Sequence, residues 1–235
     1  MSRTRPETTR DLSYFYASVY GDLQYTGLLG RLQGIVHRLM ERPYDGLPAD
    51  VILEVGAGNG QHVRHVRSRT STYYETDLAV GEGLDHAGER RVGDLRVVRC
   101  EADAEDLRDF DDDSVDRVVA TCLLAHLPHT ERALAEWRRV TRDGGHITIY
   151  VPAEPGLMLR LGRAVATAPK ARRLGSDFHN VVNRDHKNSY LHMKAVVRHV
   201  YADDDVRWRR YPFAFASWNF NLFAIVDVTV RKPGA

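Results

Sequence analysis

Hydrophobic residues along the chain fall into short β-branched runs separated by stretches with helical spacing. Seven runs have the length and composition of buried strands. They are residues 51–55, 72–76, 95–100, 115–121, 146–152, 206–213 and 220–230. Helical spacing predicts helices at residues 60–69, 79–91, 130–141, 155–175 and 189–201. Strands that alternate with helices in this way are typical of an α/β fold, in which helices cover both faces of a mostly parallel sheet.

The two ends of the chain depart from this alternation. Residues 11–42 have helical spacing and predict two helices, broken near Gly21 and at Gly30 or Gly34. Five aromatic residues crowd this segment, either as a face packed on the core or as a lid over a ligand; they are Tyr14, Phe15, Tyr16, Tyr20 and Tyr25. The last two strand-like runs have a short connection, which predicts an antiparallel pair at the sheet edge.

The pattern predicts a single domain over residues 1–235 with four parts. These are a helical lid at 11–42, a core of alternating strands and helices at 50–152, an insertion at 153–203 and closing strands at 204–232. The insertion contains a helix with a basic side formed by Arg160, Arg163, Lys170, Arg172 and Arg173. We interpret this side as a solvated helix face rather than a membrane or acidic-partner contact, because glycine and proline interrupt the apolar face opposite.

The charge balance argues against a dedicated nucleic-acid binder. Lys and Arg number 33 against 32 Asp and Glu, so the protein has no overall field that would attract a polyanion. Cys100 and Cys122 lie in or beside predicted strands, which argues against a disulfide framework or a zinc site. No run of 18 apolar residues occurs, and the N-terminal segment leads into no signal-type apolar core. We therefore expect a cytoplasmic protein without stable membrane insertion.

The stretch VILEVGAGNG, at residues 51–60, is the main candidate for a binding site. An apolar strand stops at three glycines on alternate positions, Gly56, Gly58 and Gly60, and a helix is predicted directly after them. A tight glycine turn lets the backbone approach a ligand closely, and a helix start directs N–H groups at an anion. Glu54 adds an acceptor at the mouth of the turn. The stretch predicts a nucleotide-type cofactor site.

Further candidate residues follow the other predicted strands. Asp77, Asp103 and residues 121–126 all stand at predicted carboxyl ends. In open parallel sheets, ligands bind outside the carboxyl ends, near the point where the strand order reverses. The topology therefore predicts that these residues face the glycine turn.

These segments resemble the motifs of the class I S-adenosylmethionine-dependent methyltransferases. LEVGAGNG is similar to the family's first motif, E-x-G-x-G-x-G, and YYETDL to its second strand; EADAEDL resembles its adenine loop. DSVDRVVATCLLAHLP and RRVTRDGGHITIYVP resemble its fourth and fifth strand segments. The resemblance covers residues 50–152 and implies a Rossmann-like sheet of seven strands with the last strand antiparallel. It also implies S-adenosyl-L-methionine as cofactor and S-adenosyl-L-homocysteine as product.

The resemblance implies a set of cofactor-binding residues. They are Glu54, Gly56, Ala57, Gly58, Gly60, Asp77, Leu78, Asp103, Ala104, Thr121 and Cys122. Asp77 would accept hydrogen bonds from the ribose hydroxyls, and Asp103 from the adenine amino group. The backbone of the glycine turn would lie against the methionine part, and Thr121 and Cys122 would lie near the sulfonium.

Two other interpretations of the cofactor motif compete with the methyltransferase resemblance. A dinucleotide-binding dehydrogenase also has a strand, a glycine turn and an acidic residue, but its glycines follow G-x-G-x-x-G, whereas this chain has G-x-G-x-G. A protein of the methyltransferase fold could also bind the cofactor and catalyse another reaction or act as a regulatory partner. The motif residues do not separate that alternative from methyl transfer.

Methyl transfer requires a positioned nucleophile and, where the nucleophile is protonated, a base. His126, His179 and His186 are the candidate bases. No N-P-P-Y or D-P-P-Y follows the fourth strand, which disfavours nucleic-acid bases as acceptors, and the hard oxygen ligands of a magnesium site are missing, so we expect no metal. We expect a small-molecule acceptor with an oxygen or nitrogen nucleophile, bound between residues 11–40 and 156–200. A lipid headgroup is a less favoured acceptor, and an oligomeric state is left open.

Overall fold

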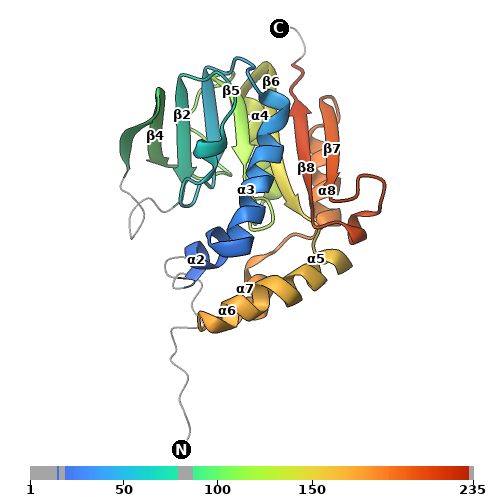
Figure 1. Ribbon diagram of the computed structural model, residues 1–235. Helices are drawn as coiled ribbons and strands as arrows, with labels where there is room; N and C mark the ends of the chain where they lie inside the picture. The colour runs from blue at the N-terminus through green and yellow to red at the C-terminus, as the bar shows by residue number, and fades with distance from the viewer. Residues whose placement is uncertain (1–14, 16–18, 79–86, 233–235) are drawn as a thin grey trace, which may run out of the picture.

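The computed structural model describes residues 15, 19–78 and 87–232. They form an eight-stranded sheet in the order β3-β4-β2-β1-β5-β6-β8-β7 (Figure 1). The strands are β1 Val51–Val55, β2 Thr72–Asp77, β3 Gly88–Val92, β4 Leu95–Glu101, β5 Val115–Ala120, β6 Thr141–Pro152, β7 Asp205–Tyr211 and β8 Phe223–Thr229. Neighbours from β4 to β6 pair in parallel, whereas β3 and β8 are antiparallel to their neighbours. The α/β sheet with an antiparallel last strand is confirmed, with eight strands instead of seven.

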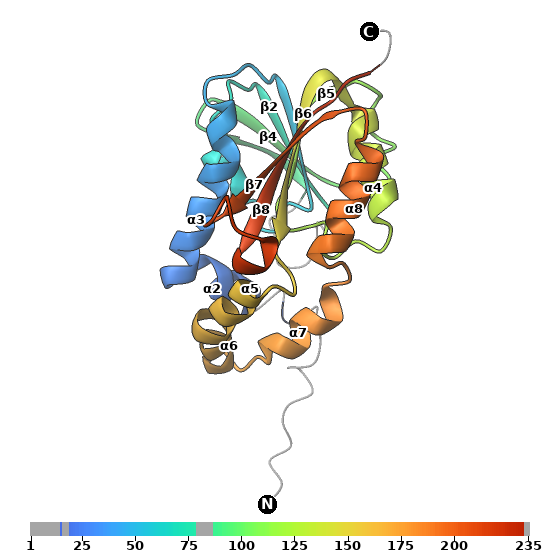
Figure 2. The ribbon, with the colours of Figure 1, turned by 90° about the vertical axis from the view of Figure 1, so that its right-hand side faces the viewer.

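Helices cover both faces of the sheet, as predicted (Figure 2). α3 (Gly27–Glu41) lies on one face, and α4 (Thr130–Val140) and α8 (Tyr190–Val200) lie on the other. Four short helices gather at one end of the sheet: α2 Tyr20–Tyr25, α5 Leu157–Gly162, α6 Ala168–Arg173 and α7 Phe178–Asp185. A π-helical turn, η5 (Arg163–Thr167), joins α5 to α6. The parallel strands finish at this end, so the short helices enclose the candidate site.

The central strands are buried on both sides, which explains their continuous apolar runs. One core lies between the sheet and α4 with α8, and its largest fully buried side chain is Trp137. The Trp137 indole N–H donates to the carbonyl of Ala104 at 2.9 Å, so the ring also fixes the loop after β4. A smaller core, which includes Met40 and Ile52, lies under α3. The loops at the strand ends are therefore anchored to two packed layers.

The predicted helix at residues 60–69 is wrong. This segment contains only a short 3₁₀ turn, η4 (His62–His65), followed by irregular chain. The buried His62 side chain places Nε2 2.8 Å from Glu41 Oε1 at the end of α3, and the Arg67 backbone N–H donates to the same carboxylate. α3 packs directly on this turn. Because contacts with α3 fix the segment, it does not form a helix of its own.

The predicted helix at residues 79–91 is also wrong where the structure describes it. Residues 79–86 lie outside the described part, and Gly88–Val92 form β3, antiparallel to β4. Gly93, with a φ of 63°, and Asp94 make the two-residue turn of this hairpin. A Gly-Asp pair between two strand-like runs is a hairpin signal. The helix prediction instead followed the helical spacing of residues 79–91.

The N-terminal helices are broken at a different place from the one predicted. The break falls at the extended residue Thr26, between α2 and α3, and not at Gly21, Gly30 or Gly34. Gly30 lies inside α3, where a side chain would meet the carbonyl of Tyr25 at 2.4 Å. This glycine therefore permits the tight corner between the two helices rather than ending one. The predicted helix residues before Phe15 lie outside the described residues.

Candidate functional site

The glycine turn after β1 has the conformation that its sequence predicts. Gly56, Gly58 and Gly60 have φ values of 66°, 51° and 61°, which side chains rarely allow. A Cβ on Gly56 would lie 2.7 Å from the side chain of Leu123, and one on Gly60 would lie 2.6 Å from that of Glu75. A Cβ on Gly58 would meet nothing within 4 Å. The outer two glycines thus permit close packing, and the middle one presents bare backbone to open space, as a bound cofactor requires.

Charged residues of the neighbouring strands hold this turn in place. Asp77, at the end of β2, accepts a hydrogen bond from the Gly58 backbone N–H at 2.8 Å. Arg99 of β4 donates to the Gly58 carbonyl and also pairs with the buried Glu75. Arg90 of β3 completes the cluster through a second ion pair with Glu75. Sequence analysis missed Glu75, Arg90 and Arg99, because their proximity depends on the order of β2, β4 and β3.

Glu54 lies at the end of β1 and is almost completely buried. Its carboxylate accepts hydrogen bonds from Tyr73 at 2.9 Å and from Thr121 at 3.2 Å. Burial raises the pKa of Glu54 to about 7, since a charge is costly away from water. This side chain therefore ties the glycine turn to the end of β5, where Thr121 and Cys122 follow. Cys122 has a φ of 61°, an uncommon conformation for a residue with a side chain and one found often at functional sites.

The remaining predicted cofactor residues lie at the ends of β2 and β4. Leu78 follows β2 directly and is 64 % exposed, and Asp103 is exposed after β4. One oxygen of Asp103 accepts from the Glu105 backbone N–H at 2.9 Å, which fixes the loop. Ala57 and Ala104 are buried beside the turn and this loop. The bare turn, the carboxylates of Asp77 and Asp103 and the exposed Leu78 fit an adenosyl cofactor laid across the strand ends.

A cavity of about 290 Å³ lies next to these strand ends, between α2 with α3 and the segment from α5 to α7. Thr121, Cys122 and Tyr150 line it from the sheet, and Tyr20 and Tyr25 from α2. Burial and the charges of Glu54 and Cys122 raise the pKa of Tyr25 to about 12. Tyr25 therefore lines the cavity, and its role in a lid stays a prediction. Tyr14 and Tyr16 lie outside the described residues.

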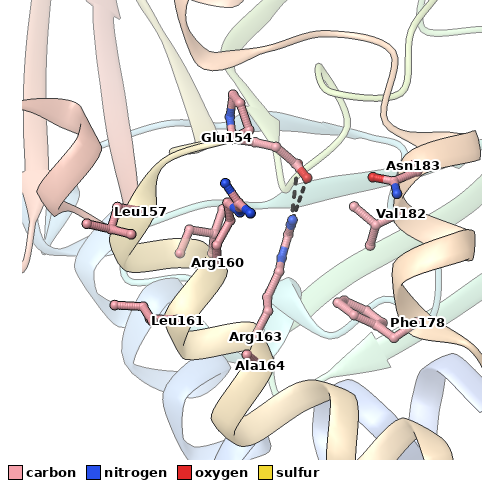
Figure 3. Close-up of a pocket in the computed structure, with 11 residues that line it drawn as sticks. Glu154, Leu157, Arg160, Leu161, Arg163, Ala164, Phe178, Val182 and Asn183 are labelled. Carbon is pink, nitrogen blue, oxygen red and sulfur yellow. Dashed lines mark hydrogen bonds and ion pairs between the residues drawn. The ribbon is translucent and has the colours of Figure 1, made fainter.

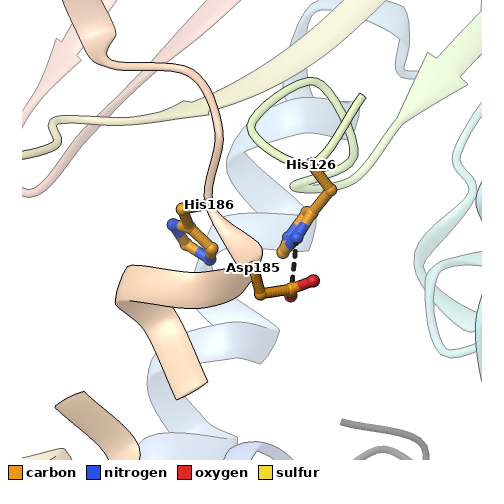
Figure 4. Close-up of side chains that lie close together, drawn as sticks. All are labelled: His126, Asp185 and His186. Atoms are coloured by element: carbon orange, nitrogen blue, oxygen red, sulfur yellow. Dashed lines mark ion pairs between the residues drawn. The ribbon is translucent and has the colours of Figure 1, made fainter. Parts of the chain in front are cut away.

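Two of the three predicted histidines meet in this cavity (Figure 4). His126 Nδ1 lies 2.8 Å from Asp185 Oδ2, and the His126 and His186 rings stand edge to face with centroids 4.5 Å apart. Burial disfavours the charged imidazole, but hydrogen bonds with Asp185 and Cys122 dominate and raise the pKa of His126 to about 10. His179 belongs to α7, and its side chain lies outside the described part of the structure.

A second ion pair supports His186. Its Nδ1 contacts the Glu154 carboxylate, which also pairs with Arg163 (Figure 3). Burial favours the neutral acid, but these two partners lower the pKa of Glu154 to about 2. Arg163 stands with Phe178 and Val182 between this cavity and a neighbouring one of about 540 Å³. The ion pair between Glu154 and Arg163 therefore lies beside the wall that the two cavities share.

The histidine cluster also has the composition of a metal site. One atom each of His126, Asp185 and His186 lie within 4.8 Å of one another, and two imidazoles with a carboxylate suit a divalent transition metal. The 2.8 Å contact between His126 and Asp185 also fits a hydrogen bond, in which a proton and not a metal ion joins the two side chains. The expectation of a metal-free site stays a prediction.

Comparisons with known proteins agree with this geometry. Residues 53–149 match a family model described as a methyltransferase domain. A phosphatidylethanolamine N-methyltransferase of Cereibacter sphaeroides is 30 % identical over 134 residues, which make up 54 % of this chain and 64 % of that protein. The chain thus spans less than two thirds of the length of this relative.

Two solved structures show the same fold. An O-methyltransferase family protein from Burkholderia thailandensis has a TM-score of 0.59 at 14 % identity, over 96 % of this chain and 64 % of that one. A S-adenosylmethionine-dependent methyltransferase from Thermotoga maritima, described as a possible histamine N-methyltransferase, has a TM-score of 0.54 at 15 % identity, over 92 % and 97 %. Since these proteins are named for different acceptors, the shared fold does not select one.

Proposed function

We propose that the chain is a class I S-adenosylmethionine-dependent methyltransferase that transfers a methyl group to an oxygen or nitrogen atom of a small-molecule acceptor. The match of residues 53–149 to a methyltransferase domain supports this proposal. The acceptor would bind in the cavity between the lid helices and α5 to α7. The observation that carries this proposal is the His126–Asp185 pair, which lines the same cavity as Thr121 and Cys122 at the end of β5. In this proposal, the pair would supply a base beside the strand end that faces the cofactor.

In this proposal, different residues bind the cofactor, align the acceptor and accept the proton. When bound, S-adenosyl-L-methionine would supply an electrophilic methyl group for the acceptor's lone pair, with S-adenosyl-L-homocysteine as the leaving group. The glycine turn, Asp77 and Asp103 would hold the cofactor, and the cavity walls would align the nucleophile. His126 would take the proton that the nucleophile loses, and Asp185 would orient the ring and stabilise the imidazolium.

A second candidate acceptor is the amine of a phospholipid headgroup. The curated relative is named for phosphatidylethanolamine, at 30 % identity over part of its length. In this chain, apolar and aromatic side chains make up most of the cavity wall, including Leu29, Leu159 and Phe223. A lipid headgroup would bring an amine to His126 while part of its chain occupies the apolar wall. A protonated amine must lose a proton before it attacks, so the same base would serve.

Transfer of a labelled methyl group tests the proposal. The protein would be incubated with methyl-labelled S-adenosyl-L-methionine and, separately, a metabolite extract, ethanolamine and phosphatidylethanolamine vesicles. We expect label in a product from one of these acceptors and none with the Gly56→Val variant, whose cofactor turn cannot form. Tight cofactor binding without labelled product would contradict methyl transfer and favour a cofactor-binding protein that catalyses another reaction.

A further inference from the structure

Exposed apolar side chains concentrate at the end of the molecule where the cavity lies. Of thirteen exposed large hydrophobic residues in the described structure, nine lie on three elements at this end. They are Leu28, Leu32 and Ile35 of α3, Leu157, Leu161 and Val165 of α5 and η5, and Phe213, Phe215 and Phe220 between β7 and β8. Val165 is 78 % exposed and Phe215 is 90 % exposed. We call this set the mouth face.

One helical segment belongs to both the mouth face and the cavity. Leu157, Leu161 and Val165 are spaced by four residues and therefore share one side of the helix. Leu159, Gly162 and Ala166, on other sides of the same helical segment, line the cavity. On α3, Leu32 and Ile35 line the cavity while remaining more than 40 % exposed. The helical segments that carry the mouth face thus also form part of the wall of the cavity that contains the histidine cluster.

Direct contacts hold the three elements of the mouth face together. The Leu157 backbone N–H donates to Asn219 Oδ1 at 2.8 Å, which joins α5 to the segment between β7 and β8. The Lys170 ammonium donates to the carbonyls of Leu23 and Thr26 at 2.9 and 2.8 Å, which joins α6 to the start of α3. Both ribbon views show α5, α6 and the start of α3 at one end of the molecule (Figures 1 and 2). Hydrogen bonds therefore connect the segments that carry the mouth face, and its side chains are not scattered over unrelated parts of the surface.

The exposed charged residues of these helical segments are basic. Residues 157–173 contain no aspartate or glutamate, and the only acidic residue of α3 is Glu41, which is buried. Exposed arginines are present on both helical segments, including Arg31 and Arg38 on α3 and Arg160, Arg172 and Arg173 on α5 and α6. Exposed leucines and phenylalanines accompanied by arginines are typical of surfaces that lie in the headgroup region of an anionic bilayer.

We propose that the mouth face binds the surface of a bilayer that contains anionic lipids and that the cavity opens toward the bilayer. None of the helices in the described part of the chain has the length and hydrophobicity of a membrane span. The arginines bind lipid phosphates, and the leucine and phenylalanine side chains enter the headgroup region. This proposal differs from the solvated helix face expected from the sequence, and it is supported by the exposed residues 157, 161 and 165, which continue across Gly162. It deepens the lipid version of the proposed function.

Vesicle sedimentation tests this inference without measuring activity. The full chain would be mixed with vesicles of phosphatidylcholine alone and with vesicles that also contain phosphatidylglycerol. We expect binding to the anionic vesicles only. A Leu161→Glu/Val165→Glu double variant should lose at least about tenfold in partitioning, because two carboxylates would have to enter an anionic headgroup region. Leu47→Glu is the matched control, because Leu47 is similarly exposed at the opposite end of the sheet, before β1.

Several outcomes would overturn the inference. No binding of the wild type to anionic vesicles would do so, as would equal binding by the double variant once calorimetry shows that it still binds S-adenosyl-L-homocysteine. A wild-type dimer that the double variant converts to a monomer in light scattering would assign the face to a second copy of the chain. Methyl transfer to a water-soluble acceptor without vesicles would leave the proposed function intact, so the two failures are distinguishable.

Discussion

The cofactor half and the acceptor half of this protein are assembled in different ways. The residues that would hold the cofactor lie within a stretch from Glu54 to Cys122, at or just after the carboxyl ends of the parallel strands β1, β2, β4 and β5. The acceptor half joins α2, the loop after β5, the segment after β6 and the end of α7. Its central pair, His126 and Asp185, is 59 positions apart in the chain. Sheet topology therefore positions the first half, whereas packing between an N-terminal lid and a late insertion positions the second.

The two halves should be separable by mutation, and the largest effect is expected in the cofactor half. Gly56→Val should abolish S-adenosyl-L-homocysteine binding in calorimetry, because a side chain there meets Leu123 at 2.7 Å and requires a strained φ. The matched control is Gly144→Ala, where φ is also positive but a Cβ meets nothing within 4 Å. Equal cofactor affinity in wild type and Gly56→Val would move the site away from the glycine turn.

The next largest effect is expected in the acceptor half. His126→Ala should lower kcat by roughly 10²–10⁴-fold, the usual contribution of a general base, while cofactor affinity changes little. His199→Ala, an exposed histidine on α8, serves as the control. If His126→Ala turned over at the wild-type rate, the ring would have only a packing role. If it lost cofactor binding as well, the two halves would not be separable.

A smaller effect should appear in the pH dependence. Because the pKa of His126 is raised to about 10, its neutral, basic form increases with pH, and kcat/KM of the wild type should rise through the neutral range. Asp185→Asn removes the charge that favours the imidazolium, so the rise should level off about one to three pH units lower. A profile that does not move would show that Asp185 has no influence on the titrating group.

The smallest expected effect is that of a chelator. If a proton joins His126 to Asp185, dialysis against EDTA should leave turnover unchanged. Loss of turnover, followed by recovery with zinc or manganese, would instead identify His126, Asp185 and His186 as metal ligands. Metal analysis of the purified protein would give the same answer without an acceptor.

Much of the cofactor half could be predicted because its signals are local. A β-branched run followed by alternating glycines specifies a strand and a turn. Asp77 ends β2, and Asp103 comes two residues after β4. The ion pairs of Glu75 with Arg90 and Arg99 could not be predicted in the same way. They depend on the order of three neighbouring strands and on a hairpin that forms where a helix was predicted.

The acceptor half was predicted only as a set of segments and candidate histidines. The sequence placed Asp185 next to His186, and the structure pairs it with His126 instead, because α7 ends beside the loop that follows β5. Glu154, just after β6, pairs with Arg163 at the start of η5, with the helix α5 between them in the chain. The failed helix at residues 60–69 has a similar cause, since His62 binds the buried Glu41 of α3. Contacts between distant segments decide these features, and no local pattern records them.

The most direct test is a crystal structure of the protein with S-adenosyl-L-homocysteine. We predict that the ribose hydroxyls lie on the Asp77 carboxylate and that the sulfur lies beside Thr121 and Cys122, facing the cavity that contains His126. A sulfur atom that faces away from this cavity would contradict the division into a cofactor half and an acceptor half. A cofactor bound away from the glycine turn would contradict it as well.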